Sequence, residues 1–388
     1  MSSSGASCTG YACYRASTVY GCPLDYRKSL QSPPLVGDFL ANTSTVIAHR
    51  EERVRPMAIA DFEDNLALAL SKYISSKAEM ANLVRLTAGA SQETWSFDAV
   101  VDGESRGLIL RRPPRGVPES KERALRQKSE ARIIRIAYEH GVLVPEIVFE
   151  AEPEDGIGVG FVMARIEGET LGTRINRDEM YAEMRNNLAY QCGAAAATVH
   201  KVPIDGLDFL ETITPEETWE RNWESYNKVF EEPSPVFEAA FRFLKERLPE
   251  QDRVTLVHGD YRNGNLMYGT DGLRSILDWE IVHIGDPMED LAWICVNSWR
   301  FGNIDKPVGG FGQREDLFAG YEAQSGIKVD PERVRYYEIF GSLRWGVSCR
   351  GMAFTHLDGH DRSVERAAIG RRSSECEADL MILLGEAF

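Results

Sequence analysis

The chain has 388 residues and a mass of 43.5 kDa, and its 44 basic and 60 acidic residues give a formal net charge of −16. It is 43% hydrophobic and 27% charged, which excludes a disordered, collagen-like or disulfide-scaffold chain and is typical of a globular protein with a large core. The acidic balance disfavours nucleic acid as a partner, because phosphate backbones are bound through lysine and arginine. No stretch approaches the roughly 18 consecutive apolar residues of a membrane-spanning helix, so we expect no membrane partner.

Seven cysteines are present, an odd number with no Cys-x-x-Cys pair. This usage favours reduced thiols and a cytoplasmic protein over a secreted disulfide framework. Residues 1–56 are rich in Ser, Thr, Tyr, Pro and Cys and show neither helical nor strand periodicity. We interpret them as a poorly ordered extension without the apolar core of a secretory signal.

Residues 57–167 alternate between strand and helix patterns. Apolar residues at helical spacing predict helices over 60–74 and 121–138, the second with an apolar stripe that includes Leu125. Short runs bounded by turn residues predict strands over 84–86, 95–101, 107–110, 148–150 and 160–164. This order predicts an N-terminal lobe built on a small, mixed antiparallel sheet with a helix.

The remainder, residues 168–388, is predicted to be mainly helical. Helices are expected over 177–200, 215–230 and 235–248, and again from residue 288 to the end. Between them lie a short buried strand, 254–257, and a hairpin formed by 265–268 and 273–277 around Gly269 and Gly272. We therefore predict an α+β protein of two lobes, with the boundary near Glu167 and Gly168.

The polar residues around the hairpin suggest phosphoryl transfer. Asp260 follows the predicted strand, Asn265 comes five positions later, and Asp278 ends the second strand of the hairpin. Phosphoryl transfer requires one carboxylate that orients the attacking hydroxyl, together with a second carboxylate and an amide oxygen that hold Mg²⁺ against the phosphates. The order matches the catalytic loop and metal-binding aspartate of kinases, with residues 258–260 (H-G-D) in place of H-R-D.

This segment resembles the aminoglycoside phosphotransferase family, the small-molecule relatives of protein kinases. The runs L-D-W-E (277–280), G-D-P-M-E-D (285–290) and S-W-R-F-G (298–302) are most similar to phosphotransferase domains associated with acyl-CoA dehydrogenases. The resemblance covers about residues 86–301. It implies a two-lobed protein-kinase-like fold, with Asp260 as catalytic base and Asn265 and Asp278 as Mg²⁺ ligands.

The same resemblance implies a nucleotide site on the N-terminal lobe. Residues 87–97 stand where a nucleotide-covering loop belongs, and Gly89 and Ser91 would offer backbone amides to phosphate oxygens. The third strand carries Arg111 where the family has a phosphate-binding lysine, and arginine can serve because it stays charged and binds phosphate bidentately. Glu130 in the following helix is the candidate ion-pair partner of Arg111.

Residues 161–166 resemble the hinge between the two lobes of a kinase. Adenine would bond there to the carbonyl group of Ala164 and the amide of Ile166, while Met163 would line the pocket.

We expect an ATP- and Mg²⁺-dependent phosphotransferase acting on a hydroxyl group of a small molecule. A protein kinase is disfavoured, because only eight positions separate Asp278 from Asp286 and no A-P-E motif follows. The resemblance suggests a hydroxy acid or hydroxyacyl-CoA as acceptor. An aminoglycoside or other amino alcohol is the alternative that the net charge suits, and a catalytically weak nucleotide-binding pseudokinase is a second alternative. A basic rim around the pocket would favour the acyl acceptor and an acidic rim the amino alcohol, and the oligomeric state is left open.

Three further polar residues have both a functional and a structural interpretation. Asp286 and Asp290 could contact the substrate, but we favour structural roles, with Asp286 capping a helix that starts at Pro287. Arg300 could meet an anionic group of the acceptor or lie as a surface charge.

Overall fold

The structure is a computed structural model that describes residues 59–86, 92–114, 120–359 and 363–387. The chain divides into residues 1–54 and 55–388, and the extension predicted over 1–56 lies outside the described residues, as do Gly89 and Ser91. None of the helices in the described ranges is both long and apolar enough to cross a membrane.

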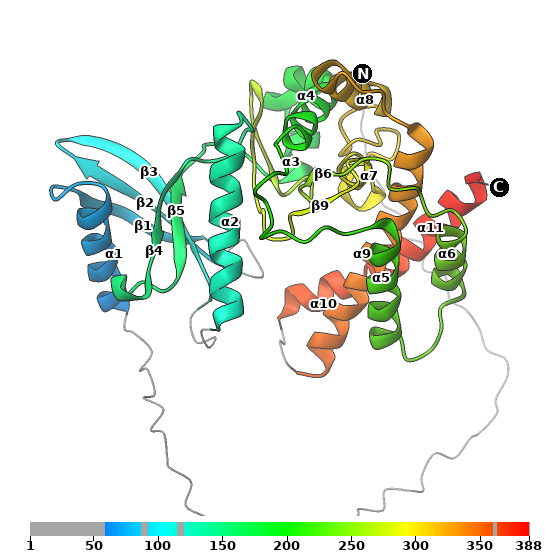
Figure 1. The fold of residues 1–388 in the computed structure, drawn as a ribbon, viewed down its shortest axis with the longest axis horizontal. Coiled ribbons are helices and arrows are strands. Elements are labelled where there is room, and N and C mark those ends of the chain that lie inside the picture. The colour runs from blue at the N-terminus through cyan, green and yellow to red at the C-terminus, as the bar shows by residue number, and fades with distance from the viewer. Residues whose placement is uncertain (1–58, 87–91, 115–119, 360–362, 388) are drawn as a thin grey trace, which may run out of the picture. The chain divides into compact units, whose positions relative to one another are not determined.

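The N-terminal part of the described chain, up to Ala164, contains a five-stranded antiparallel sheet (Figure 1). Its strand order is β1-β2-β3-β5-β4, and the strands are β1 (Glu79–Leu86), β2 (Glu93–Val101), β3 (Glu104–Arg112), β4 (Ile147–Ala151) and β5 (Gly160–Ala164). The turn between β2 and β3 places Asp102 and Gly103 at φ values of 51° and 88°, a left-handed pair that matches the twist of a two-residue hairpin.

Two helices cover opposite faces of this sheet, α1 (Ile59–Tyr73) and α2 (Lys121–Glu139) (Figure 1). Because successive side chains of a strand point to opposite faces, Leu108 and Leu110 of β3 join the cluster of α1 while Ile109 joins that of α2. The same alternation directs Arg111 and Arg112 to different faces. Arg112 pairs with buried Glu93 at 2.7 Å, whereas Arg111 is directed to the face that carries α2.

The larger C-terminal part is built mainly from helices. They are α3 (Gly172–Arg177), α4 (Ala182–His200), α5 (Pro215–Val229), α6 (Pro235–Lys245), α7 (Met288–Trp293), α8 (Arg314–Ser325), α9 (Pro331–Leu357), α10 (Val364–Gly370) and α11 (Ser373–Ala387). Helices α4 and α8 pack closely because Gly193 and Gly320 lack side chains. A Cβ atom at Gly193 would lie 1.9 Å from the Leu317 carbonyl oxygen, and one at Gly320 would lie 2.0 Å from that of Tyr190.

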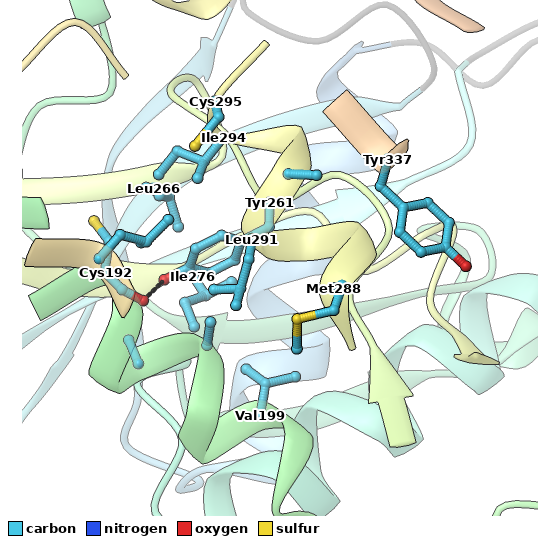
Figure 2. Close-up of a cluster of buried hydrophobic side chains, with 14 of the residues drawn as sticks. Cys192, Val199, Tyr261, Leu266, Ile276, Met288, Leu291, Ile294, Cys295 and Tyr337 are labelled. Carbon is cyan, nitrogen blue, oxygen red and sulfur yellow. Dashed lines mark hydrogen bonds between the residues drawn. The ribbon is translucent and has the colours of Figure 1, made fainter. Parts of the chain in front are cut away.

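Two short strand pairs frame the segment that contains Asp260. Strand β6 (Thr255–Val257) pairs with β9 (His283–Gly285), and β7 (Leu266–Gly269) forms a hairpin with β8 (Gly272–Ile276). Apolar side chains from these strands, α4 and α7 form a buried cluster (Figure 2). In it, the Tyr261 hydroxyl donates a hydrogen bond of 2.8 Å to the Cys192 carbonyl oxygen. The core thus fixes the residue that immediately follows Asp260.

The predicted fold class is confirmed by an antiparallel N-terminal sheet followed by a mostly helical region. Several details were wrong. The helix expected over 177–200 is split, because α3 ends at Arg177 and α4 begins at Ala182. Leu125 is 64% exposed and does not belong to the buried face of α2. Strand β9 was not foreseen, since three residues are too few to show a periodic pattern.

Candidate active site

A buried aspartate anchors the segment that carries Asp260. The Asp290 carboxylate accepts hydrogen bonds from the backbone amides of His258 (2.8 Å) and Gly259 (2.9 Å), and its Oδ2 lies 3.1 Å from His200 Nε2. Burial alone would raise the pKa of Asp290, but His200 and the His258 amide hold that pKa below its usual value. Asp290 therefore stays ionised inside the core, and the structural role predicted for it is confirmed.

His258 links Asp260 to the strand end that precedes Asp278. Its Nδ1 accepts from the Asp260 amide at 3.2 Å, and its Nε2 lies 3.0 Å from the Leu277 carbonyl oxygen. These partners fit a neutral ring with the proton on Nε2. The Leu277 amide in turn donates to the Asn265 carbonyl oxygen at 2.7 Å. Local backbone contacts thus bring the three predicted site residues into one neighbourhood.

The Asp260 carboxylate is held from two sides. Its Oδ1 accepts from Trp293 Nε1 (2.6 Å) and Arg262 Nε (2.9 Å), and its Oδ2 accepts from Asn265 Nδ2 (2.6 Å). Burial would raise the pKa of Asp260, but Arg262 and the Trp293 hydrogen bond lower it overall. The group is therefore an anion at neutral pH, and it can accept a hydrogen bond from a hydroxyl group.

Asn265 contacts this carboxylate, and Asp278 follows Leu277, whose amide binds the Asn265 carbonyl oxygen. Because the Asn265 amide nitrogen is used on Asp260, its amide oxygen remains to act as an acceptor. Asp278 has a φ of 68°, an uncommon left-handed conformation for a residue other than glycine, and its side chain is 30% exposed. An amide oxygen and an accessible carboxylate are ligands that suit Mg²⁺.

The side chain of Arg111 extends from β3 to Asp278. Its Nη2 lies 2.7 Å from Asp278 Oδ1 and 3.3 Å from Glu130 Oε1, so the partnership expected between Arg111 and Glu130 is present. Gln92, which was not foreseen, accepts from Arg111 Nε at 3.1 Å and donates to Glu130 Oε2 at 2.9 Å. Burial raises the pKa of Glu130, although the Arg111 charge opposes that shift.

The hinge candidates lie at the end of β5 and just after it. Met163 is buried in the cluster that includes α2, and Ala164 is the last residue of the strand. Ile166 is half-buried, and its amide has no hydrogen-bond partner within the described residues, which leaves it available as a donor. At Glu169 the chain pairs with Tyr268 and so joins the hairpin that follows Asn265.

Two further expectations are decided by direct contacts. Asp286 accepts from the Met288 amide at 2.9 Å at the start of α7, but the helix begins at Met288 with Pro287 in the N-cap position, one residue later than predicted. The other Asp286 oxygen pairs with Arg333. Neither interpretation of Arg300 holds. Its side chain is buried against Glu338 at 2.8 Å, so its charge is already balanced and does not reach the surface.

Sequence reasoning missed three residues around Asp260. Arg262 is only two positions after Asp260, so its contact with Asp260 could have been predicted from the sequence. Trp293 of α7 and Arg344 of α9 are distant from Asp260 in the chain, so their positions could not. Arg344 Nη2 donates to the Gly259 carbonyl oxygen at 2.7 Å, and its guanidinium lies 3.9 Å from the centroid of the Trp293 ring. A cavity of about 780 Å³ between α6, α8 and α9 includes none of these residues.

The fold and this arrangement define a phosphotransferase of the kinase-like class. The family profile described as "Phosphotransferase enzyme family" (APH) matches residues 82–335, well over half of the chain. The chain belongs to this family, which confirms both the resemblance inferred from the motifs and the expected enzyme class.

Relatives of known structure or curated sequence support the same fold. The mouse acyl-CoA dehydrogenase family member 10 is 28% identical over 69% of this chain and 26% of its own length. A Ralstonia eutropha protein assigned to the aminoglycoside phosphotransferases superposes with a TM-score of 0.67 at 20% identity, covering 83% of this chain and 98% of its own. Choline kinase from Cryptosporidium parvum gives a TM-score of 0.54 at 12% identity, covering 83% and 95%. The chain spans about a quarter of the mouse relative.

Proposed function

We propose that the protein transfers the γ-phosphoryl group of ATP to a hydroxyl group of a small molecule in a Mg²⁺-dependent reaction, and that the acceptor is a hydroxy acid or a hydroxyacyl-CoA. The observation that carries this proposal is the contact of 2.6 Å between Asn265 and Asp260, with Asp278 held beside them through the Leu277 amide. A carboxylate acceptor, an amide oxygen and a second carboxylate are the parts that phosphoryl transfer requires.

Asp260 acts as the catalytic base in this proposal. Its lowered pKa makes it a weak base, so its main contribution is to accept the hydrogen bond of the acceptor hydroxyl and to orient that oxygen towards phosphorus. Trp293 and Asn265 fix the carboxylate in one orientation. The proton is taken up as the new P–O bond forms and the bond to the ADP oxygen breaks.

Asn265 and Asp278 fit a magnesium ion. Within the described ranges no cluster of three His, Cys, Asp or Glu side chains is present, but Mg²⁺ usually takes only one or two protein carboxylates and completes its shell with phosphates and water. The Asn265 amide oxygen and the Asp278 carboxylate supply such a partial set. When bound, the ion would neutralise phosphate charge as the transferred group develops negative charge.

Arg111 and Glu130 would bind and orient the nucleotide phosphates. Arg111 stays charged because Glu130 and Asp278 raise its pKa against the opposing effect of burial. Gly89 and Ser91 are proposed to cover the phosphates. The adenine ring would lie against Met163 and bond to the Ala164 carbonyl and the Ile166 amide. A solved relative, aminoglycoside phosphotransferase APH(2'')-Ib, is described as ADP-bound, which supports nucleotide use in this fold.

An acyl acceptor is supported by the curated relatives and by local charge. The sequence relatives are acyl-CoA dehydrogenases, and phosphorylating a hydroxyl group turns it into a leaving group that prepares an acyl chain for elimination. Two arginines, Arg262 and Arg344, lie beside Asp260. Arg262 is paired with the Asp260 carboxylate, so Arg344 is the cation that would favour an acyl acceptor over an aminoglycoside or other amino alcohol.

The buried thiols favour a cytoplasmic protein. All four cysteines that the structure describes, Cys192, Cys295, Cys349 and Cys376, are free and buried. Reduced thiols persist in a reducing compartment.

An ATP-consumption screen tests the proposed function. Purified full-length protein is offered hydroxy acids, their CoA thioesters and aminoglycosides, each with and without Mg²⁺. We expect turnover with at least one hydroxy acid or CoA thioester only when Mg²⁺ is present, and phosphate on the acceptor hydroxyl by mass spectrometry. Turnover with aminoglycosides alone would establish the amino-alcohol alternative. Nucleotide binding without turnover of any acceptor would establish the pseudokinase alternative.

A further inference from the structure

Arg344 lies in direct contact with two residues that hold Asp260. It reaches from α9 to the Gly259 carbonyl oxygen, at 2.7 Å, and its guanidinium stacks at 3.9 Å on the ring of Trp293. Gly259 immediately precedes Asp260, and Trp293 donates a hydrogen bond of 2.6 Å to its carboxylate. The guanidinium is therefore linked through one intervening residue to the Asp260 carboxylate, which orients the attacking hydroxyl.

The two oxygens of the Asp260 carboxylate have different partners. Asn265 binds Oδ2, and it belongs to the side that carries Asp278 and Arg111. Trp293 binds Oδ1, and Arg344 stacks on Trp293. Arg344 is thus connected to Asp260 through the oxygen that the proposed magnesium ligand Asn265 does not bind, and we expect the acceptor to approach from that side.

Arg344 lacks the short ion pair that other arginines here have, although the carboxylates of Asp260, Glu289 and Asp290 act on its charge from farther away. Arg111, Arg112 and Arg300 each have a carboxylate oxygen within 2.8 Å. Among the described residues, no carboxylate lies within ion-pairing distance of the Arg344 guanidinium, whose partners are a carbonyl oxygen and an aromatic ring. Because Arg344 is half-buried and has no carboxylate in direct contact, its guanidinium can still bind an anionic ligand.

Arg344 can be reached from solvent, although the hollow beside it has a volume of only about 10 Å³ and is too small to enclose a carboxylate. The residue is only half-buried, and this hollow is lined by Gly259, Glu289, Trp293, Tyr337, Phe340 and Gly341. Glu289 is the one acidic residue in this lining, and its Oε2 is directed to His283 Nε2 at 3.5 Å. The neighbouring Arg262 adds a second positive charge that Asp260 already balances.

We infer that Arg344 is a specificity-determining residue that binds an oxyanion, a carboxylate or phosphate oxygen, carried by the acceptor. This inference rests on the proposed function and names the feature by which the enzyme would choose among hydroxylated molecules. A planar guanidinium binds such groups with two parallel hydrogen bonds, which fixes the acceptor in orientation as well as in place. A cationic acceptor would instead be repelled by the same group.

The test compares Arg344→Gln and Arg344→Lys with the unchanged protein on matched acceptors. For the acceptor that turns over, kinetics are measured on the free hydroxy acid and on its neutral primary amide. We expect Arg344→Gln to lower kcat/KM for the acid by roughly 10²-fold, to leave the amide within a few fold, and to leave the KM for ATP unchanged. Arg344→Lys should retain part of the preference for the acid, because the charge remains. The matched control is Arg350→Gln, an exposed arginine on the same helix, which should behave as the unchanged protein.

A second comparison identifies the source of the anion. If the anion is a CoA phosphate, the CoA thioester should lose activity in Arg344→Gln while the phosphate-free pantetheine thioester does not. If it is the carboxylate, only the free acid should respond. Equal losses for charged and neutral acceptors would overturn the inference while leaving the kinase assignment intact. Absence of ATP turnover with every acceptor in the unchanged, folded protein would instead reject the proposed function itself.

Discussion

Arg111 on β3 and Asp278 after β8 form an ion pair, with 2.7 Å between Nη2 and Oδ1. Both residues are proposed to serve other partners, the first a phosphate group and the second a magnesium ion. In the structure, each of these two side chains therefore neutralises the charge of the other. Binding of a magnesium-nucleotide complex would offer both a partner of opposite charge, so the contact can be exchanged without leaving an unpaired charge.

Replacing Arg111 should weaken nucleotide binding. Arg111→Ala removes the phosphate partner and leaves buried Glu130 without its cation, so we expect ATP affinity to fall by about tenfold or more, with Arg111→Lys intermediate. Titration calorimetry with an ATP analogue measures the change. Arg106→Ala, on the same strand but in an exposed pair with Glu146, is the control and should bind normally. Normal affinity in Arg111→Ala would remove Arg111 from the nucleotide site.

Asp278 should be required for Mg²⁺-dependent binding. In Asp278→Ala the Asn265 amide oxygen is the one proposed protein ligand left, so the affinity for ATP should become independent of Mg²⁺. Nucleotide binding is measured at several Mg²⁺ concentrations in the variant and in the unchanged protein. A variant that still binds ATP more tightly as Mg²⁺ is added would show that the ion is held elsewhere.

Asp260 should affect the chemical step and not nucleotide binding. Asp260→Ala removes the acceptor of the hydroxyl hydrogen bond, and we expect kcat to fall by at least ~10²-fold with little change in nucleotide affinity. Arg262 loses its partner in this variant, so Asp260→Asn, which keeps the shape, is measured beside it. Full activity in both variants would falsify the assignment of Asp260 as catalytic base.

The sequence predicted those parts of the site that lie within one short segment. The strand expected over 160–164 coincides with β5, because a buried run bounded by glycine and charged residues has few other interpretations. Asp260 and Asn265 were found because their spacing is fixed by a single loop. Trp293 and Arg344 could not be found this way.

The two missed residues reach Asp260 only through helix packing. Arg344 bonds to a residue 85 positions earlier in the chain, and Trp293 to one 33 positions earlier. Their positions depend on how α7 and α9 cross. Helix α9 shows no amphipathic pattern, because much of its first half is buried on all sides. A local pattern does not encode which side chain of such a helix faces a loop.

Asp290 gives the prediction with the clearest dependence on pH. Its carboxylate is fully buried and accepts from two backbone amides and His200, so Asp290→Asn should lower the free energy of unfolding by about 3 kcal/mol at neutral pH. The pKa of Asp290 is lowered in the folded protein from an unfolded value of 3.8. The unfolded chain therefore binds this proton first as the pH falls, and the stabilisation present above pH 3.8 is lost below it. The difference in free energy of unfolding between the two proteins, measured by urea unfolding, should stay constant from pH 7 to about pH 5 and shrink below pH 3.8.

The control is Asp271→Asn, at an exposed hairpin position paired with Arg274, which should change stability little at any pH. A difference that grows on acidification would mean that Asp290 is protonated in the folded protein, and the anchoring of residues 258 and 259 would then need another explanation.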